Sequence, residues 1–158
     1  MSKDKIINDI VVLGLGNPLM ADEGIGGFVI DKLLEKKDSY PNVDFIDAGT
    51  GGMAILRLIA DRKKAIIIDS AYMSKLPGTM VKFRPQEVQS VKNLLHYSLH
   101  EIDILKVIDL ASQLNQCPDE IVIFGIEPEK IEFREGLSLS LQKKTDEYIE
   151  TIKSELQS

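Results

Sequence analysis

The sequence predicts an α/β fold, a three-layer α/β/α sandwich around a mostly parallel, twisted sheet. Three short runs rich in Val and Ile are typical of buried parallel strands, at Ile10–Leu15, Ala65–Ile68 and Ile121–Gly125. The segments between them carry apolar residues at helical spacing. Strands that alternate with helices favour right-handed crossovers and a sheet covered on both faces.

The first half of the chain supplies three strands and two helices in turn. After the strand Ile10–Leu15, apolar residues recur at helical spacing through Glu23–Lys36. A second strand is expected at Val43–Ile46. A glycine-rich turn then leads into a helix at Met53–Ala60, and Ala65–Ile68 is the third strand.

The second half is expected to complete the sheet and to end on a helix. Pro77-Gly78 is a turn signal, and the alternating run Thr79–Arg84 predicts an antiparallel edge strand. Ile102–Leu114 has helical spacing, and Ile121–Gly125 is the last core strand. A single long helix is predicted over Leu137–Leu156.

Size and composition fit one soluble domain over residues 1–158. The net charge of −6 and the pI of about 5.0 argue against nucleic acid as a partner, because phosphate binding needs clustered Lys and Arg. Cys117 is the single cysteine, so an internal disulfide is excluded and a reduced, cytoplasmic location is expected. The sequence has no apolar run long enough to span a membrane, and a monomer is expected.

The glycine loop after the first strand does not match the nucleotide-binding motifs. A dinucleotide fingerprint needs a third glycine three positions after Gly16, where Leu19 stands instead. The acidic pair Asp22-Glu23 at the expected helix start would also repel a pyrophosphate. A phosphate-binding Gly-Lys-Ser/Thr sequence is missing as well.

Glu23, Asp69 and His100 are the candidate functional residues. Glu23 follows the first strand, Asp69 ends the third, and His100 opens a helical segment. Ligands of open α/β sheets bind outside the carboxyl ends of the strands, so these side chains are expected near one crevice. Two carboxylates and an imidazole suit a divalent metal.

Each candidate has a plainer interpretation that spacing leaves open. Asp22 and Glu23 are also typical of residues that cap a helix, and Asp69 of a residue that caps the turn at Ser70. Asp47 ends the neighbouring strand and is not separable from Asp69 by spacing. His96 lies four residues before His100, although Ser98 and Glu101 form a capping box that places His100 in the first helical turn.

The order of short motifs along the chain resembles that of the hydrogenase maturation endopeptidases, peptidase family M52. The glycine loop continues through Asp22-Glu23-Gly24-Ile25-Gly26 and is followed by further matching strings. These strings are Asp47-Ala48-Gly49-Thr50, Ile67-Ile68-Asp69-Ser70-Ala71, Pro77-Gly78-Thr79, Ser98-Leu99-His100 and Phe124-Gly125-Ile126-Glu127-Pro128. Each string alone is weak, and their order and spacing are specific.

The resemblance implies an α/β/α sandwich and ranks the candidates. It favours Asp69 over Asp47 and His100 over His96, and it makes Glu23, Asp69 and His100 the metal-contacting and catalytic trio. It also implies that a substrate groove is lined by further residues of the loops, namely Asn17, Asp47, Gly49, Thr50 and Gly51.

The resemblance also implies the reaction and the partner. The expected activity is an aspartic-type, carboxylate-assisted endopeptidase that removes a C-terminal extension from the precursor of a [NiFe] hydrogenase large subunit. Nickel would come bound to the precursor and serve for recognition, and zinc or cadmium would be surrogates. The resemblance leaves open how the attacking water is activated. Glu23 or Asp69 would act as a general base, or a bound metal would activate the water.

Two other functions fit the same residues. The protein would then be a metallopeptidase with its own permanently bound metal, or a metal-binding or sensing module without catalysis. An O,O,N ligand set accepts several divalent metals, so the ligand types do not by themselves select nickel.

Overall fold

Strands of the central sheet are mostly parallel in the computed structural model, which describes residues 7–87 and 99–158 without the side chains of residues 99–103. Within that part, the sheet has the order β2-β1-β3-β5-β4. The strands are β1 (Ile10–Gly14), β2 (Val43–Asp47), β3 (Lys64–Ser70), β4 (Met80–Phe83) and β5 (Glu120–Ile126). β4 pairs antiparallel with β5, as predicted for the edge strand.

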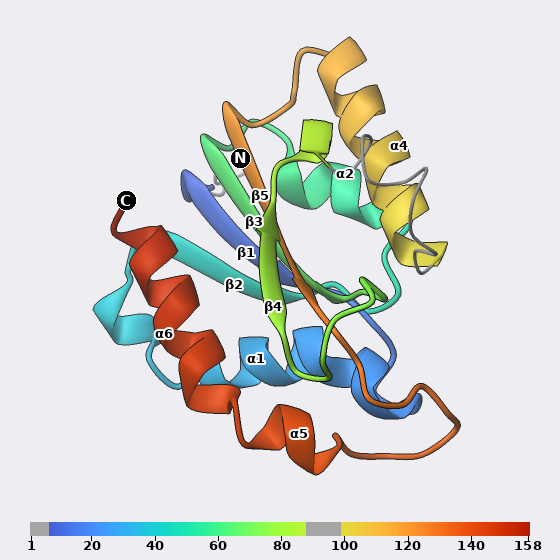
Figure 1. The fold of residues 1–158 in the computed structure, drawn as a ribbon. Helices are drawn as coiled ribbons and strands as arrows, with labels where there is room; N and C mark the ends of the chain where they lie inside the picture. The colour runs from blue at the N-terminus through green and yellow to red at the C-terminus, as the bar shows by residue number, and fades with distance from the viewer. Residues whose placement is uncertain (1–6, 88–98) are drawn as a thin grey trace.

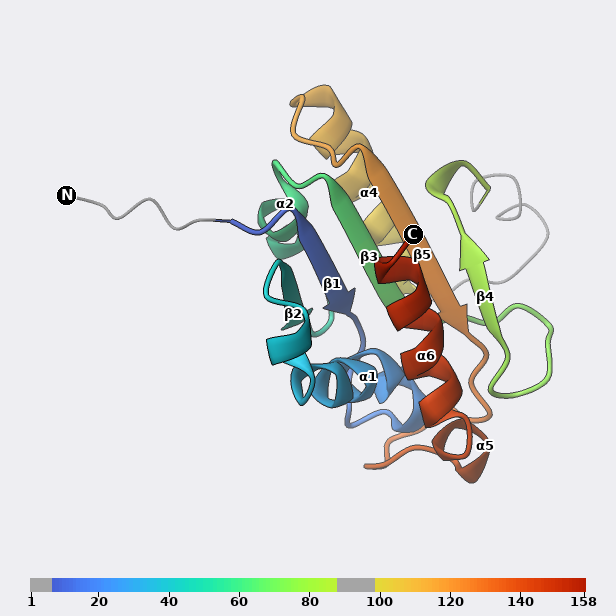
Figure 2. The ribbon, with the colours of Figure 1, turned by 90° about the vertical axis from the view of Figure 1, so that its left-hand side faces the viewer.

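Helices cover both faces of this sheet (Figures 1 and 2). α1 (Ile25–Leu34) and α6 (Thr145–Leu156) lie on one face, with the short α5 (Leu139–Gln142) at its end. α2 (Ala54–Ile59) and α4 (Leu99–Gln113) lie on the other. The predicted three-layer sandwich is confirmed. None of the helices in the described ranges is long and apolar enough to cross a membrane.

The pleat of the strands divides the core into two clusters. Val12, Ile66 and Val122 pack beneath α1 and α6, while alternate residues of the same strands face α2 and α4. Fully burying each such aliphatic side chain contributes about 1.5–3 kcal/mol. Both faces are apolar because both are covered, which explains the continuous Val and Ile runs of the central strands.

Two predicted helices differ from the structure. Leu137–Leu156 is two helices, α5 and α6, separated by a turn at residues 143–144, where the Thr145 hydroxyl donates to the Gln142 carbonyl at 2.9 Å. Glu23–Lys36 begins as the 3₁₀ turn η1 (Ala21–Gly24) before α1, and a second turn, η2 (Lys37–Ser39), follows it.

An ion-pair network attaches the end of α6 to the sheet. The Glu155 carboxylate lies 3.2 Å from Lys64 Nζ on β3 and 2.9 Å from Lys82 Nζ on β4. Lys64 also donates to the main-chain carbonyl of Glu155 at 3.0 Å. The C-terminal helix is thereby held across three elements that are distant in sequence.

Candidate functional site

The sheet reverses its winding between β1 and β3. β1 pairs with β2 on one side and with β3 on the other, while α1 and α2 cross on opposite faces. A crevice forms outside the carboxyl ends of two strands at such a switch point. Asp69 lies at the end of β3, and η1, which carries Glu23, contacts that strand. Two of the three candidates therefore meet at the expected place.

Asp69 is a buried carboxylate with one unsatisfied oxygen. Its side chain is 1% exposed. Oδ1 accepts a hydrogen bond from the Ser70 N–H at 2.9 Å, so the turn-capping interpretation holds for that oxygen. Oδ2 is buried and has no hydrogen-bond partner among the described residues. Burial, together with the nearby Glu23 carboxylate, raises the pKa of Asp69 to about 8. A group with this pKa is mostly protonated at neutral pH, so a cation at Oδ2 would take the place of that proton.

Close backbone contacts place Glu23 beside Asp69. A Cβ at Gly16 would overlap the Glu23 carbonyl oxygen, and a Cβ at Gly26 would lie 2.7 Å from the Ile68 carbonyl oxygen. Gly16 also has a φ of +121°, in the region that favours glycine. Only glycine at these positions lets η1 and the start of α1 rest directly on the strand ends.

His100 lies in the first turn of α4, as the capping pattern predicts, but its side chain is outside the described part of the structure. His96 and Ser98 lie outside the described residues altogether. Among the side chains that are described, no group of three His, Cys, Asp or Glu residues is arranged to hold a metal ion. The complete trio therefore stays a prediction.

The loops predicted to line a groove are connected at the same edge of the sheet. The Gly16 N–H donates to the Gly49 carbonyl at 2.6 Å, which joins the loops after β1 and β2. Asn17 Oδ1 accepts from the Leu19 N–H at 2.9 Å. Asp47 Oδ1 accepts from the Gly49 N–H at 3.0 Å. Both polar side chains therefore stabilise the conformation of the loops through local hydrogen bonds.

The glycine-rich loop continues through Thr50 and Gly51. Thr50 is exposed and Gly51 has a φ of +87°. Asp47, the rival of Asp69, is exposed on the edge strand β2. Contact of these residues with a substrate stays a prediction.

Asp22 has a structural role that the sequence does not predict. Its fully buried carboxylate accepts hydrogen bonds from the N–H groups of Glu129 (2.9 Å), Lys130 (3.2 Å) and Ser138 (2.7 Å). The helix-capping interpretation is therefore wrong for Asp22. Instead, this residue attaches the loop between β5 and α5 to η1, and thereby supports its neighbour Glu23.

Tyr72 and Glu127 were not among the candidate residues, although Glu127 lies in one of the motif strings of the resemblance. Glu127 follows β5, is 6% exposed and accepts a hydrogen bond from the Met73 N–H. Tyr72 follows Asp69 by three residues, and its pKa is raised by partial burial and by the Glu127, Asp22 and Glu23 carboxylates. The position of Glu127 directly after a strand, like that of Asp69, was a signal that could have identified it.

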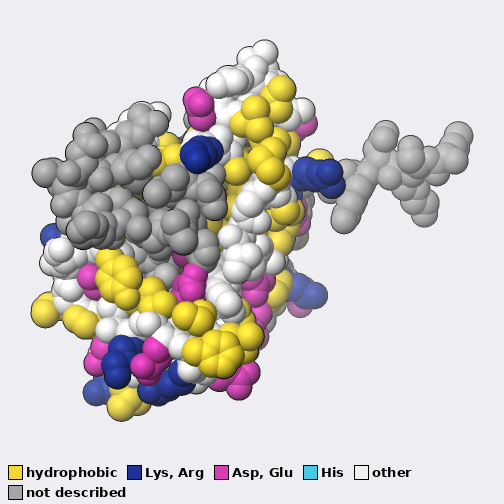
Figure 3. Space-filling model, turned by 90° about the vertical axis from the view of Figure 1, so that its right-hand side faces the viewer, with side chains coloured by type: hydrophobic (Ala, Val, Ile, Leu, Met, Phe, Trp, Pro, Cys, Tyr) yellow, Lys and Arg dark blue, Asp and Glu magenta, His cyan; other side chains and the backbone are white. Residues whose placement is uncertain are grey.

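Large apolar side chains are exposed on the loops around this crevice. They belong to the segments after four different strands, at Leu19, Met53, Tyr72, Leu76 and Phe133. Leu76 is 80% and Phe133 84% exposed. Figure 3 shows hydrophobic side chains interspersed with acidic and basic ones on the lower part of one face. Exposed apolar side chains on several loops at one end of a sheet are compatible with binding of a protein surface.

Comparison with known proteins gives one consistent family. A family model described as HycI, hydrogenase maturation protease, matches residues 28–155. A putative hydrogenase maturation protease of Methanocaldococcus jannaschii is 31% identical over 153 residues, covering 94% of this chain and 96% of that protein. The hydrogenase expression/formation protein HupD of Rhodobacter capsulatus is 31% identical over 123 residues, which are 78% of this chain but 59% of HupD. The chain thus spans about three fifths of the length of such longer relatives.

Solved structures agree with this assignment. The hydrogenase maturating endopeptidase HybD of Escherichia coli superposes with a TM-score of 0.82 at 28% identity, covering 94% of this chain and 91% of that one. The [NiFe] hydrogenase maturation protease HybD of Thermococcus kodakarensis has a TM-score of 0.73 at 27% identity, with coverage of 92% and 97%.

Proposed function

The chain belongs to the hydrogenase maturation protease family, and on that premise we propose that it is an endopeptidase that trims the precursor of a [NiFe] hydrogenase large subunit. The reaction removes a C-terminal extension after nickel has been inserted into the precursor. One observation carries the proposal. A buried carboxylate with an unpartnered oxygen, Asp69, lies beside Glu23 at the switch point of the sheet.

The proposed recognition element is the nickel ion of the substrate. An unpaired buried carboxylate is costly, and a docking cation compensates that cost. Glu23, Asp69 and His100 would contact the nickel, so the scissile bond is held in the crevice only once the metal has been inserted. Zinc or cadmium would occupy the same position as surrogates.

In this proposal the residues of the chain hold the scissile peptide bond in place and transfer protons during the reaction. Holding the peptide bond next to a water molecule lowers the barrier by several kcal/mol, about 7 or more in well-oriented cases. One carboxylate of the pair, Glu23 or Asp69, accepts a proton from the attacking water and then gives that proton to the departing amine. Burial of Asp69 at the strand end excludes competing solvent from its side of the crevice.

The partner in this proposal is a protein, and the loops around the crevice support that. The exposed apolar side chains at Leu19, Leu76 and Phe133 suit a protein surface better than a small polar substrate.

The test is a cleavage assay with two forms of one precursor. The protein is mixed with nickel-loaded and nickel-free large-subunit precursor, and loss of the extension is followed by mass spectrometry. We expect cleavage of the loaded form and loss of activity in Asp69→Asn and His100→Ala. Equal cleavage of the nickel-free form would overturn recognition through nickel.

Metal analysis separates the two other functions. A stoichiometric metal that survives dialysis of the active protein would favour a metallopeptidase with its own metal. Metal binding without any cleavage of the loaded precursor would favour a sensing module.

A further inference from the structure

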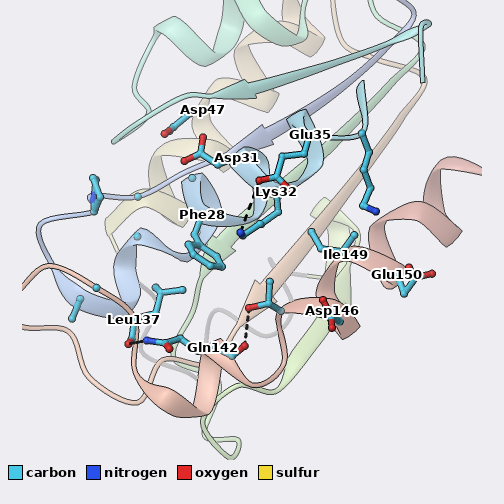
Figure 4. Close-up of a pocket in the computed structure, with 18 residues that line it drawn as sticks. Phe28, Asp31, Lys32, Glu35, Asp47, Leu137, Gln142, Asp146, Ile149 and Glu150 are labelled. Atoms are coloured by element: carbon cyan, nitrogen blue, oxygen red, sulfur yellow. Dashed lines mark hydrogen bonds and ion pairs between the residues drawn. The ribbon is translucent and has the colours of Figure 1, made fainter. Parts of the chain in front are cut away.

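A groove of about 880 Å³ runs between α1 and the α5–α6 segment. Figure 4 shows Phe28 and Asp31 of α1 on one side, and Asp146, Ile149 and Glu150 of α6 on the other. Its lining does not include Asp69 or Glu23, although it does include Asp47, one of the residues expected to line a substrate groove. Nothing in the proposed chemistry requires it.

The lining of the groove combines apolar side chains with an excess of negative charge. Phe28, Leu137 and Ile149 supply the apolar surface. Five carboxylates line the groove against two lysines, a net charge of −3. Lys32 is one of these lysines, and its Nζ lies 5.7 Å from the centre of the Phe28 ring. The chemistry of the groove therefore suits a segment with both basic and apolar side chains.

One end of the groove reaches the loops of the crevice. Gly16, Pro18 and Asp47 line that end, and Gly16 packs directly against the backbone of Glu23. From there the groove follows α1, whose 10 residues span about 15 Å at 1.5 Å per residue. An extended peptide covers that distance with about four or five residues.

We propose that this groove binds the C-terminal extension of the large-subunit precursor as an extended segment with basic and apolar side chains. The inference rests on the function proposed above. A channel one helix long does not admit a folded domain, whereas a tail continuous with the scissile bond reaches it directly from the crevice. The groove would then select precursors by the sequence of the segment that is removed.

The test is a comparison of steady-state cleavage of the nickel-loaded precursor by groove variants. In Asp31→Asn/Asp146→Asn, we expect KM to rise about five-fold with kcat unchanged, since rim charges act on encounter and binding. High ionic strength should raise KM for the wild type and have less effect on this variant. Lys32→Gln makes the groove more negative and should lower KM about two-fold.

A matched control removes the same charge elsewhere. Asp61 and Asp119 are exposed and lie outside this groove, so Asp61→Asn/Asp119→Asn should keep the KM of the wild type. If the wild type cleaves the precursor but the Asp31/Asp146 variant keeps its KM and salt dependence, the groove proposal is overturned and the protease function stands. If the wild type does not cleave loaded precursor, both fall.

Discussion

At the scale of single residues, two buried carboxylates differ in how their oxygens are satisfied. Asp22 accepts three hydrogen bonds from main-chain N–H groups, which offset the cost of burying its charge. Asp69 accepts one, on Oδ1, and its Oδ2 has no hydrogen-bond partner in the described structure. Asp22 therefore has the contacts of a structural residue, while Asp69 retains capacity for a ligand.

Amide substitutions of these two residues should change stability in opposite directions. Asp69→Asn removes an incompletely satisfied buried carboxylate, so we expect the free energy of unfolding at pH 8 to rise by about 1–3 kcal/mol while cleavage is lost. Asp22→Asn leaves one side-chain oxygen for three N–H donors, so we expect the free energy of unfolding to fall by about 2–4 kcal/mol. Urea unfolding measures both. A destabilised Asp69→Asn would contradict the proposed state of its carboxylate.

At the scale of elements, the placement of the crevice depends on how closely α1 approaches the strand ends. Gly26 lies against the backbone of Leu15 and Ile68, whereas the neighbouring Gly27 faces the exposed Asp47 side chain. Backbone atoms of two paired strands cannot move aside without breaking the sheet, but an exposed carboxylate can rotate. A side chain is therefore excluded at Gly26 but can be accommodated at Gly27.

Alanine at each of these glycines tests that difference. Gly26→Ala should push α1 away from the sheet and lower the free energy of unfolding by about 2–4 kcal/mol, with slower cleavage because Glu23 moves. Gly27→Ala is the control, since the helix propensity of alanine offsets the contact with Asp47, and we expect a change within about 1 kcal/mol. Thermal unfolding and the cleavage assay report both effects. Equal destabilisation by the two substitutions would show that the close approach of α1 to the sheet does not cause the loss of stability in Gly26→Ala.

The sequence predicts the strands better than the helix junctions and the site contacts. The strands at β1, β3 and β5 were predictable because covered parallel strands are continuously apolar. The break at residues 143–144 was not, because apolar spacing continues across it. Spacing also could not separate Asp47 from Asp69, since both end a strand. What distinguishes them is burial, which follows from the order of strands in the sheet.

At the scale of the whole molecule, the candidate site and the main ion-pair network lie near opposite ends of the sheet. The carboxyl ends of the strands carry Asp69 and the loops with exposed apolar side chains. Near the opposite end, Lys64 at the start of β3 joins the ion-pair network around Glu155. Stability and activity should therefore respond to separate substitutions and to separate changes of pH.

Acid stability reports on the Glu155 network. Burial alone would raise the pKa of Glu155, but the hydrogen bond from Lys82 and the ion pairs with Lys64 and Lys82 outweigh it and lower the pKa below the ordinary value of 4.5. The network therefore stabilises the fold above pH 4.5, and this contribution is lost as the pH falls through the lower folded pKa. Glu155→Gln should cost about 2 kcal/mol at pH 7 and less at low pH. A cost that is independent of pH, measured by urea unfolding, would contradict this assignment.

The exposed apolar side chains at the carboxyl ends of the strands should contribute to binding of a protein substrate but hardly to the stability of the fold. Leu76 and Phe133 are mostly exposed, so Leu76→Ser/Phe133→Ser should change the free energy of unfolding by less than about 0.5 kcal/mol. If these side chains contact the folded body of the precursor, the same variant should lower kcat/KM about ten-fold or more, because exposed apolar anchors contribute to binding. The control is Leu114→Ser, since Leu114 is 51% exposed at the end of α4, outside the loops at the carboxyl ends of the strands. Equal kcat/KM values for the double variant, the control and the wild type would mean that the precursor is held by its nickel site and its extension alone.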